Sequence, residues 1–317
     1  MIILIILIII ALIFILYGLI FTPYPFVFLL RAKKSTNTDK APNNIEEIKT
    51  LIDTELNVKY SSNYPNSQYD VYKPKIKTDK TIVWLHGGAF VAGSSVGLRN
   101  FGPLIASQGY NFYAINYAHA PEYPFPSQML QLDEFLSFIK KEFSVEDVVL
   151  GGDSAGANIV ACYSTIKNFN NEIKNKFKNE VMVKGLLLFC GPYDFCEDQN
   201  FVIPKKFEKF MKYILWSYLG HKNWQKSNKQ VLASPLRNLN SKFPPSYICD
   251  GKKFSFMWQG ELMVKKLRKE GVYVKSRFYK ELPHEFQFDY QQYPTEALQV
   301  YKDSIKFLSK LYNEGEI

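Results

Sequence analysis

The clearest chemical signal in this 317-residue chain is the segment Gly152-Asp153-Ser154-Ala155-Gly156. The segment directly follows the apolar run Val148-Val149-Leu150 and opens a helical pattern. A tight turn between a strand and a helix needs small residues, and such a turn holds a serine out at the end of the strand. The spacing therefore predicts that Ser154 is a nucleophile.

A glycine-rich loop earlier in the chain supplies what such a serine needs next. His86-Gly87-Gly88-Ala89-Phe90 follows an apolar run that ends at Leu85. Because small residues let a backbone approach a substrate closely, the N–H groups of Gly87, Gly88 and Ala89 are expected to bind the oxyanion that forms when a carbonyl is attacked. The N–H of Ala155 would complete this oxyanion hole.

A serine nucleophile also needs a base, and after a strand-turn-helix nucleophile the chain order is serine, acid, histidine. The histidines of the chain are His86, His119, His221 and His284. His86 belongs to the glycine-rich loop and His221 to a later insert. His284 lies beyond the serine and follows the apolar run Tyr273–Tyr279, so we expect it to be the base.

Alternating strand and helix patterns position these residues. Short apolar runs predict buried strands at Thr81–Leu85, Tyr110–Tyr117, Val148–Leu150, Gly185–Cys190, Ser246–Cys249 and Tyr273–Tyr279. Helical patterns lie between or after them at Ser127–Glu142, Ala155–Lys167, Met257–Glu270 and Thr295–Tyr312. This alternation predicts an α/β fold, with a mostly parallel sheet covered on both faces and a site at the carboxyl ends of its strands.

A long insert between Cys190 and Ser246 interrupts the alternation. Its apolar side chains recur at helical spacing: Phe207, Phe210, Met211, Ile214, Leu215 and Tyr218. An insert at the rim of a sheet is placed to form an apolar lid over a site. Packing of the same side chains onto the sheet is the alternative, and the two do not exclude each other.

Several of these segments together resemble the hormone-sensitive-lipase-like branch of the α/β-hydrolases, which includes arylacetamide deacetylases and many carboxylesterases. The segments that carry the resemblance, in family order and spacing over residues 78–290, are His86 to Phe90, Tyr117-Ala118-His119-Ala120-Pro121-Glu122, Pro124-Phe125-Pro126, Gly152 to Gly156, Ser234-Pro235-Leu236 and Pro244-Pro245. The resemblance implies an α/β-hydrolase fold with a helical cap. It also implies hydrolysis of carboxylic esters, sometimes amides, of hydrophobic acids, with neither a cofactor nor a metal. His284 matches the family's catalytic histidine, which precedes Gly-Phe.

The acid is where the sequence departs from the family it resembles. The family has Gly-x-x-Asp-x-Leu-x-Asp after the Pro-Pro pair, and the first Asp orients the histidine. The corresponding stretch here runs from Gly251 to Trp258, so Phe254 and Trp258 stand in place of the two carboxylates. Asp250 at the end of the same strand and Asp194 after the preceding strand are the candidate substitutes. A site without an acid is the third interpretation.

Two functions from different classes therefore stay open. The first is a membrane-anchored serine esterase or deacetylase, in which Ser154 attacks a hydrophobic, lipid-like ester and His284 moves the proton. The second is a catalytically degenerate hydrolase that serves as a structural or binding subunit of a membrane assembly with protein partners. The missing carboxylates support the second, whereas the retained serine, histidine and oxyanion loop favour the first, since a scaffold has no physical reason to keep a strained elbow.

The N-terminal segment differs from the rest of the chain because residues 1–30 carry no charged side chain. Ile2–Phe21 is an almost unbroken apolar run, which as a helix spans about 30 Å. It predicts a transmembrane anchor at 1–30, a tether and cap contribution at 31–60, and a hydrolase domain at 61–317 with a cap insertion at about 195–232. The basic residues that follow the run favour a cytosolic domain, with the lumen as the alternative.

Charge and composition exclude other classes of protein. The net charge is +9, but the lysines are scattered among Asp and Glu, which favours solvated surface over a nucleic-acid interface. A chain with 47% apolar and 22% charged residues is neither disordered nor a disulfide framework. The four cysteines lack metal-ligand spacing, so we expect free thiols, most of them buried.

Overall fold

The computed structural model describes residues 2–32, 39–168, 172–196 and 205–313. An eight-stranded sheet runs in the order β1-β2-β4-β3-β5-β6-β7-β8. Its strands are β1 Ile52–Lys59, β2 Gln68–Pro74, β3 Thr81–Leu85, β4 Asn111–Ile115, β5 Asp147–Asp153, β6 Met182–Phe189, β7 Ser246–Lys253 and β8 Val274–Pro283. The pairs from β4 through β8 are parallel, and β1 and β2 add an antiparallel edge. The expected mostly parallel sheet is confirmed.

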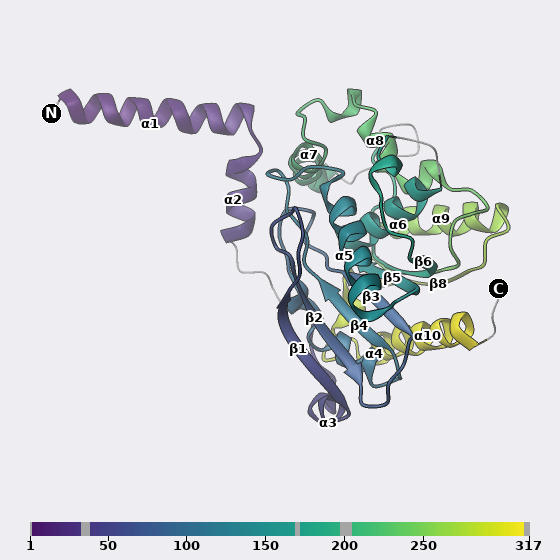
Figure 1. The fold of residues 1–317 in the computed structure, drawn as a ribbon. Helices are drawn as coiled ribbons and strands as arrows, with labels where there is room; N and C mark the ends of the chain where they lie inside the picture. Colours follow the sequence, from purple (N-terminus) through teal and green to yellow (C-terminus); the bar gives the residue numbers. More distant parts are fainter. Residues whose placement is uncertain (1, 33–38, 169–171, 197–204, 314–317) are drawn as a thin grey trace.

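Helices cover both faces of this sheet (Figure 1). They are α1 Ile2–Phe21, α2 Tyr24–Ala32, α3 Ile45–Thr50, α4 Phe101–Ala106, α5 Ser127–Phe143, α6 Ala155–Lys167, α7 Lys205–Leu219, α8 Lys229–Leu232, α9 Met257–Lys269 and α10 Pro294–Asn313. Short 3-10 helices lie at Ser95–Leu98, Lys174–Lys176, Trp224–Lys226, Pro235–Asn238 and Phe286–Phe288. α4 and α10 pack on one face, and α5, α6 and α9 pack on the other.

The central strands are buried on both faces, which is why they appear in the sequence as continuous apolar runs. In β3 every side chain is buried. Val83 and Leu85 point into the core under α5 and α6. Ile82 and Trp84 point into the opposite core under α4 and α10. Each central strand therefore packs against both cores, and this packing fixes the position of its carboxyl end.

The antiparallel edge was not predicted by the sequence patterns. β1 and α3 lie within residues 31–60, which the sequence analysis assigns to a tether and a cap contribution. Most side chains of β1, including Asp53 and Glu55, are exposed. An edge strand with charged side chains resists pairing with other chains, but it lacks the apolar run by which the central strands are recognised.

The insert between β6 and β7 contributes α7, α8 and two 3-10 helices, and Figure 1 shows α7 and α8 at the same end of the molecule as α2. Phe26 of α2 stacks on Tyr213 of α7 with ring centroids 4.9 Å apart. Tyr218 of α7 is buried and stacks on Phe90 of the glycine-rich loop at 3.7 Å. The insert therefore packs onto the domain beside this loop. Residues 197–204 of the expected cap lie outside the described residues.

The N-terminal helices form an arm on the domain. α2 packs against α7 through Val27 and Phe26, while the apolar side chains of α1 are largely exposed and α1 extends away from the body (Figure 1). Thr22 and Pro23 separate the two helices. Among the described residues, no helix has the combination of length and hydropathy that crossing a bilayer requires. The expected transmembrane anchor over residues 2–21 is therefore not supported.

Candidate active site

Ser154 sits at the turn between β5 and α6, as the Gly-x-Ser-x-Gly spacing predicts. Its backbone has φ 51° and ψ −115°, a strained conformation for a residue with a side chain. The flanking glycines are sterically required. A Cβ on Gly156 would lie 1.9 Å from the carbonyl oxygen of Leu85, and a Cβ on Gly152 would lie 2.4 Å from the carbonyl carbon of Gly156. The close packing of β5, β3 and α6 thus forces the serine out at the strand end.

His284 follows β8 and faces the serine. Its Nε2 lies 3.0 Å from Ser154 Oγ, within hydrogen-bond reach. Its backbone N–H donates to the carbonyl oxygen of Lys253 at 3.0 Å, which ties the histidine loop to the end of β7. Burial lowers the pKa of His284, while the neighbouring Glu285 charge raises it in part. A neutral imidazole at this distance is able to take the hydroxyl proton.

The second ring nitrogen of His284, Nδ1, is linked to the carboxyl group of Asp250 through the hydroxyl group of Ser255. Ser255 Oγ lies 2.6 Å from His284 Nδ1. The same hydroxyl donates to Asp250 Oδ1 at 2.6 Å. Of the two candidate acids from the sequence, Asp250 is therefore the one that the structure links to His284. Ser255 was not among the residues predicted from the sequence, where its signal is a small hydroxyl residue next to Phe254.

Asp250 is 2% exposed at the carboxyl end of β7 and is held by the turn that follows it. Besides the Ser255 hydroxyl, its carboxylate accepts the backbone N–H of Gly251 at 2.7 Å and that of Phe256 at 3.2 Å. Burial raises the pKa of Asp250 to about 8, against the opposing effect of these hydrogen bonds.

Phe254, the residue that the resemblance aligns with the acid, lies beside the cap helix α7. Its side chain is 56% exposed and its backbone has a positive φ of 55°. Its ring lies 5.7 Å from that of Phe207 in α7. Trp258, in the place of the second carboxylate, lies in the first turn of α9. Phe254 thus lies on the cap side of the site, whereas Trp258 is part of α9.

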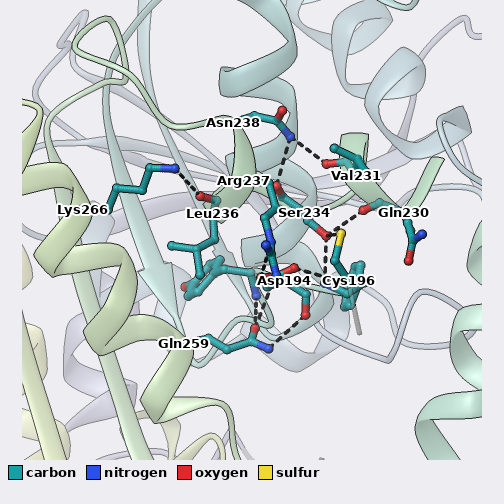
Figure 2. A network of polar contacts seen from close by, with 12 residues as sticks. Asp194, Cys196, Gln230, Val231, Ser234, Leu236, Arg237, Asn238, Gln259 and Lys266 are labelled. Atoms are coloured by element: carbon teal, nitrogen blue, oxygen red, sulfur yellow. Dashed lines mark hydrogen bonds and ion pairs between the residues drawn. The ribbon is translucent and has the colours of Figure 1, made fainter. Parts of the chain in front are cut away.

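Asp194, the alternative acid, belongs to a separate polar network that joins the insert to α9 (Figure 2). Its Oδ2 accepts Arg237 Nε at 2.6 Å, and its Oδ1 accepts the backbone N–H of Cys196 at 2.9 Å. Gln259 accepts the backbone N–H of Asp194 and donates to its carbonyl oxygen, each at 3.0 Å. Both carboxylate oxygens are thus engaged in this network, and among the described residues no hydrogen bond is found between Asp194 and His284.

The glycine-rich loop lies beside the serine with its backbone in an unusual conformation. Gly88, Ala89 and Phe90 all have positive φ, at 124°, 52° and 65°. The N–H groups of Gly88, Ala89 and Ala155 donate no hydrogen bond within the described parts of the chain. These three expected donors are therefore open to a substrate oxygen.

Gly87 differs from the other expected oxyanion donors. Its N–H donates to Asp153 Oδ2 at 2.6 Å, while Trp84 Nε1 donates to the other oxygen of the same carboxyl at 2.8 Å. In the structure, the N–H of Gly87 thus anchors the loop to β5, unlike those of the other expected donors. The physical reason is that the buried carboxyl group of Asp153 needs hydrogen-bond donors, and the N–H of Gly87 lies within reach.

A second carboxyl group, that of Glu285, lies beside Gly87, near the carboxyl group of Asp153. Glu285 has φ 61° where the resembling family has a glycine. A Cβ built on Gly87 would lie 2.5 Å from Asp153 Oδ2, 2.9 Å from Glu285 Oε1 and 3.3 Å from Ser154 Cβ. Burial, and then the Glu285 charge, raise the pKa of Asp153 to about 8. The sequence analysis missed this pair, although a Glu for Gly exchange beside the histidine is visible in the sequence.

One group of metal-ligand side chains occurs within the described ranges, and it overlaps the same site. Cys190, Asp250 and His284 each place one ligand atom within 4.8 Å of the other two. Burial raises the pKa of the Cys190 thiol well above its usual value, so the thiol is protonated. His284 Nδ1 and Asp250 Oδ1 already share Ser255. The side chains of Asp250, Ser255 and His284 are thus linked to one another by hydrogen bonds.

Comparisons with known proteins agree with the fold of this chain. A protein family described as having an alpha/beta hydrolase fold matches residues 82–288. An esterase of Acinetobacter venetianus is 24% identical over 245 residues, which cover 75% of this chain and 78% of the esterase. Arylacetamide deacetylase of Oryctolagus cuniculus is 25% identical over 171 residues, which cover 50% of this chain but only 41% of the deacetylase.

Among solved structures, esterase B from Lactobacillus rhamnosis in an inhibited form superposes with a TM-score of 0.74 at 17% identity. The superposition covers 92% of this chain and 97% of that one. At this identity the likeness establishes the shared fold.

Proposed function

The chain belongs to the alpha/beta hydrolase family, and from that premise we propose that it is a serine hydrolase that cleaves carboxylic esters. The observation that carries the proposal is the contact of Ser154 Oγ with His284 Nε2 at 3.0 Å, beside backbone N–H groups with no other partner among the described residues. The names of the relatives, an esterase and a deacetylase, support the same reaction class.

The proposed reaction follows from these positions. Ser154 Oγ attacks the carbonyl carbon of the ester while His284 Nε2 takes its proton. The oxyanion is stabilised by the N–H groups of Gly88, Ala89 and Ala155. His284 then protonates the leaving alcohol, and a water molecule, activated by the same nitrogen, releases the acid from Ser154.

We further propose that the acyl group is hydrophobic. The exposed ring of Phe254 lies 5.7 Å from Phe207 on the cap side of the site. Phe256, beside these, has its ring 6.2 Å from the His284 ring. An aromatic rim of this kind stabilises an apolar chain better than a short acetyl group. Nitrophenyl esters of graded acyl length test this, with kcat/KM expected to rise from two carbons toward medium chains.

Association with a lipid surface is also proposed. Exposed apolar side chains of α1 such as Ile5, Ile9 and Ile13 offer a surface that water does not stabilise. Flotation of the full chain with vesicles tests it. Replacing two of these isoleucines by lysine is expected to abolish flotation, whereas Ile76→Lys, at an exposed apolar position elsewhere, serves as the matched control.

A fluorophosphonate probe on the purified full chain tests the enzymatic proposal itself. Labelling is expected in the native protein and is expected to vanish in Ser154→Ala and in heat-unfolded protein. Ser164→Ala, a buried serine in the same helix α6 with its hydroxyl bonded to Val160 O, is the matched control and should label normally. Absence of labelling in folded native protein would contradict the proposal and favour a degenerate hydrolase.

A further inference from the structure

We propose that Ser255 is a positioning residue that transmits the orienting effect of Asp250 to His284, so that the site works with four linked side chains. The inference rests on the proposed function, and it assigns the role that the family gives to a carboxylate in direct contact with the histidine. Its basis is the unbroken series from Asp250 Oδ1 to Ser255 Oγ at 2.6 Å, on to His284 Nδ1 at 2.6 Å, and from His284 Nε2 to Ser154 Oγ at 3.0 Å.

The hydroxyl of Ser255 suits this position because it donates one hydrogen bond and accepts others. At a pH above about 8, Asp250 is ionised and only accepts hydrogen bonds, so the hydroxyl proton of Ser255 points toward the carboxylate. The oxygen of Ser255 is then left to accept from His284 Nδ1–H. This direction fixes the tautomer in which Nε2 carries no proton and is able to take one from Ser154.

The same direction serves the later step of the reaction. Once Nε2 has taken the proton, the ring carries a positive charge, and its Nδ1–H bond to Ser255 strengthens. The charge is stabilised by the carboxylate beyond the hydroxyl. Because Asp250 is 2% exposed, water does not screen this interaction as it would at the surface.

The local structure separates this role from a merely structural one. The turn after β7 is held by the Gly251 and Phe256 N–H bonds to Asp250 and by the bond from His284 N to Lys253 O. None of these bonds involves the side chain of Ser255. A change of the Ser255 side chain therefore breaks the link between Asp250 and His284 while the turn keeps its own bonds.

Two nearly isosteric variants test the proposal in the full chain. Ser255→Thr keeps a hydroxyl, and Ser255→Val replaces it by a methyl group that also keeps water out. We expect S255V to lower kcat on a nitrophenyl ester by about 10²- to 10⁴-fold with KM nearly unchanged, since a mispositioned base costs this much. S255T is expected to retain kcat to within about tenfold, because the donor and acceptor are still present.

A double-mutant cycle with Asp250→Asn separates the relay from independent effects. If Asp250 acts through Ser255, then S255V in the D250N background lowers kcat by less than about threefold. Additive losses would overturn the proposal, as would equal activity of S255V and S255T. Ser304→Ala, which removes a buried hydroxyl bonded within α10, controls for the general cost of such a loss. Thermal unfolding of every variant shows whether it is folded.

Failure of this inference is distinguishable from failure of the proposed function. A Ser154→Ala variant without activity, beside an S255V variant with native kcat, would leave the esterase proposal intact and remove the role of Ser255. A Ser154→Ala variant with native activity would remove the esterase proposal itself.

Discussion

The two ends of the site are built in different ways. At the nucleophile end, β5, α6 and the loop after β3 approach so closely that only glycines fit at two positions around Ser154. At the acid end, between β7 and α9, the contacts are made by side-chain hydroxyl and carboxyl groups, and the ring of Phe254 lies beside that of Phe207. Backbone packing fixes the first end and side-chain hydrogen bonds fix the second.

The difference teaches which parts of such a site tolerate change. A position set by backbone contact admits no substitute, because any Cβ would overlap main-chain atoms. A position set by hydrogen bonds admits any group that donates and accepts at the same distances. In the proposed site, the pair of Ser255 and Asp250 is therefore able to take the place of a single carboxylate, whereas the glycines of the elbow are not replaceable.

The largest effect is expected at the nucleophile end. Gly156→Ala places a Cβ 1.9 Å from Leu85 O, so that β3 and α6 must separate. Overlap of this kind in a packed core costs about 3 kcal/mol or more in unfolding free energy. We expect loss of both soluble protein and activity, measured by thermal unfolding and ester hydrolysis.

The control for this substitution lies in the same chain. Gly97 has nothing within 4 Å of a built Cβ and no positive φ, so Gly97→Ala is expected to leave the melting temperature almost unchanged. A stable G156A with native activity would show that backbone contact does not set the nucleophile end.

Asp250→Asn tests the acid end and is expected to be the next largest effect. At a pH above about 8, the amide removes the negative charge that Asp250 places behind Ser255, so His284 loses its fixed tautomer and kcat falls by about 10²- to 10⁴-fold. Asp194→Asn is the matched comparison. It weakens the ion pair with Arg237 and is expected to lower the melting temperature while kcat of the folded protein stays near native. The reverse pattern in the two variants would contradict the assignment.

The fold and half of the site were predictable from the sequence because they depend on patterns along the chain. The apolar run of β3 and the Gly-x-Ser-x-Gly spacing around Ser154 express backbone packing directly. The role of Ser255 was not predictable, since it depends on where β7 ends relative to the loop after β8. β1 was missed because its exposed, charged side chains resemble a linker.

The acid end also differs from the nucleophile end in how Asp250 makes the stability of the folded protein depend on pH. Burial raises the pKa of Asp250 from 3.8 to about 8, so between these values the folded chain keeps a proton that the unfolded chain releases. Stability therefore decreases as pH rises from about 4 to 8. Among the neighbours of Asp250, burial raises the pKa values of Cys190, Tyr193 and Cys249 well above their usual range, so these groups stay neutral here, and burial lowers the pKa of His284.

Asp250→Asn removes this contribution, while Asp153, whose pKa is raised in the same way, remains. Urea unfolding of the native chain at pH 5 and pH 8 is expected to show a larger loss of stability than unfolding of D250N. An equal or steeper loss in D250N would show that Asp250 is ionised throughout this range in the folded protein.

The smallest expected effect concerns the charge beside the oxyanion loop. Glu285 Oε1 and Asp153 Oδ2 both lie within 3 Å of the point where a Gly87 Cβ would be, next to Ser154. A negative charge there opposes the oxyanion, so Glu285→Gln is expected to raise kcat/KM for neutral esters by about threefold at pH 8. It also removes one cause of the raised pKa of Asp153. The side chain of Gln has nearly the same size as that of Glu, so the substitution changes mainly the charge. A lower kcat/KM would therefore mean that the carboxylate of Glu285 assists the reaction. The nucleophile end would then also depend on a side-chain charge.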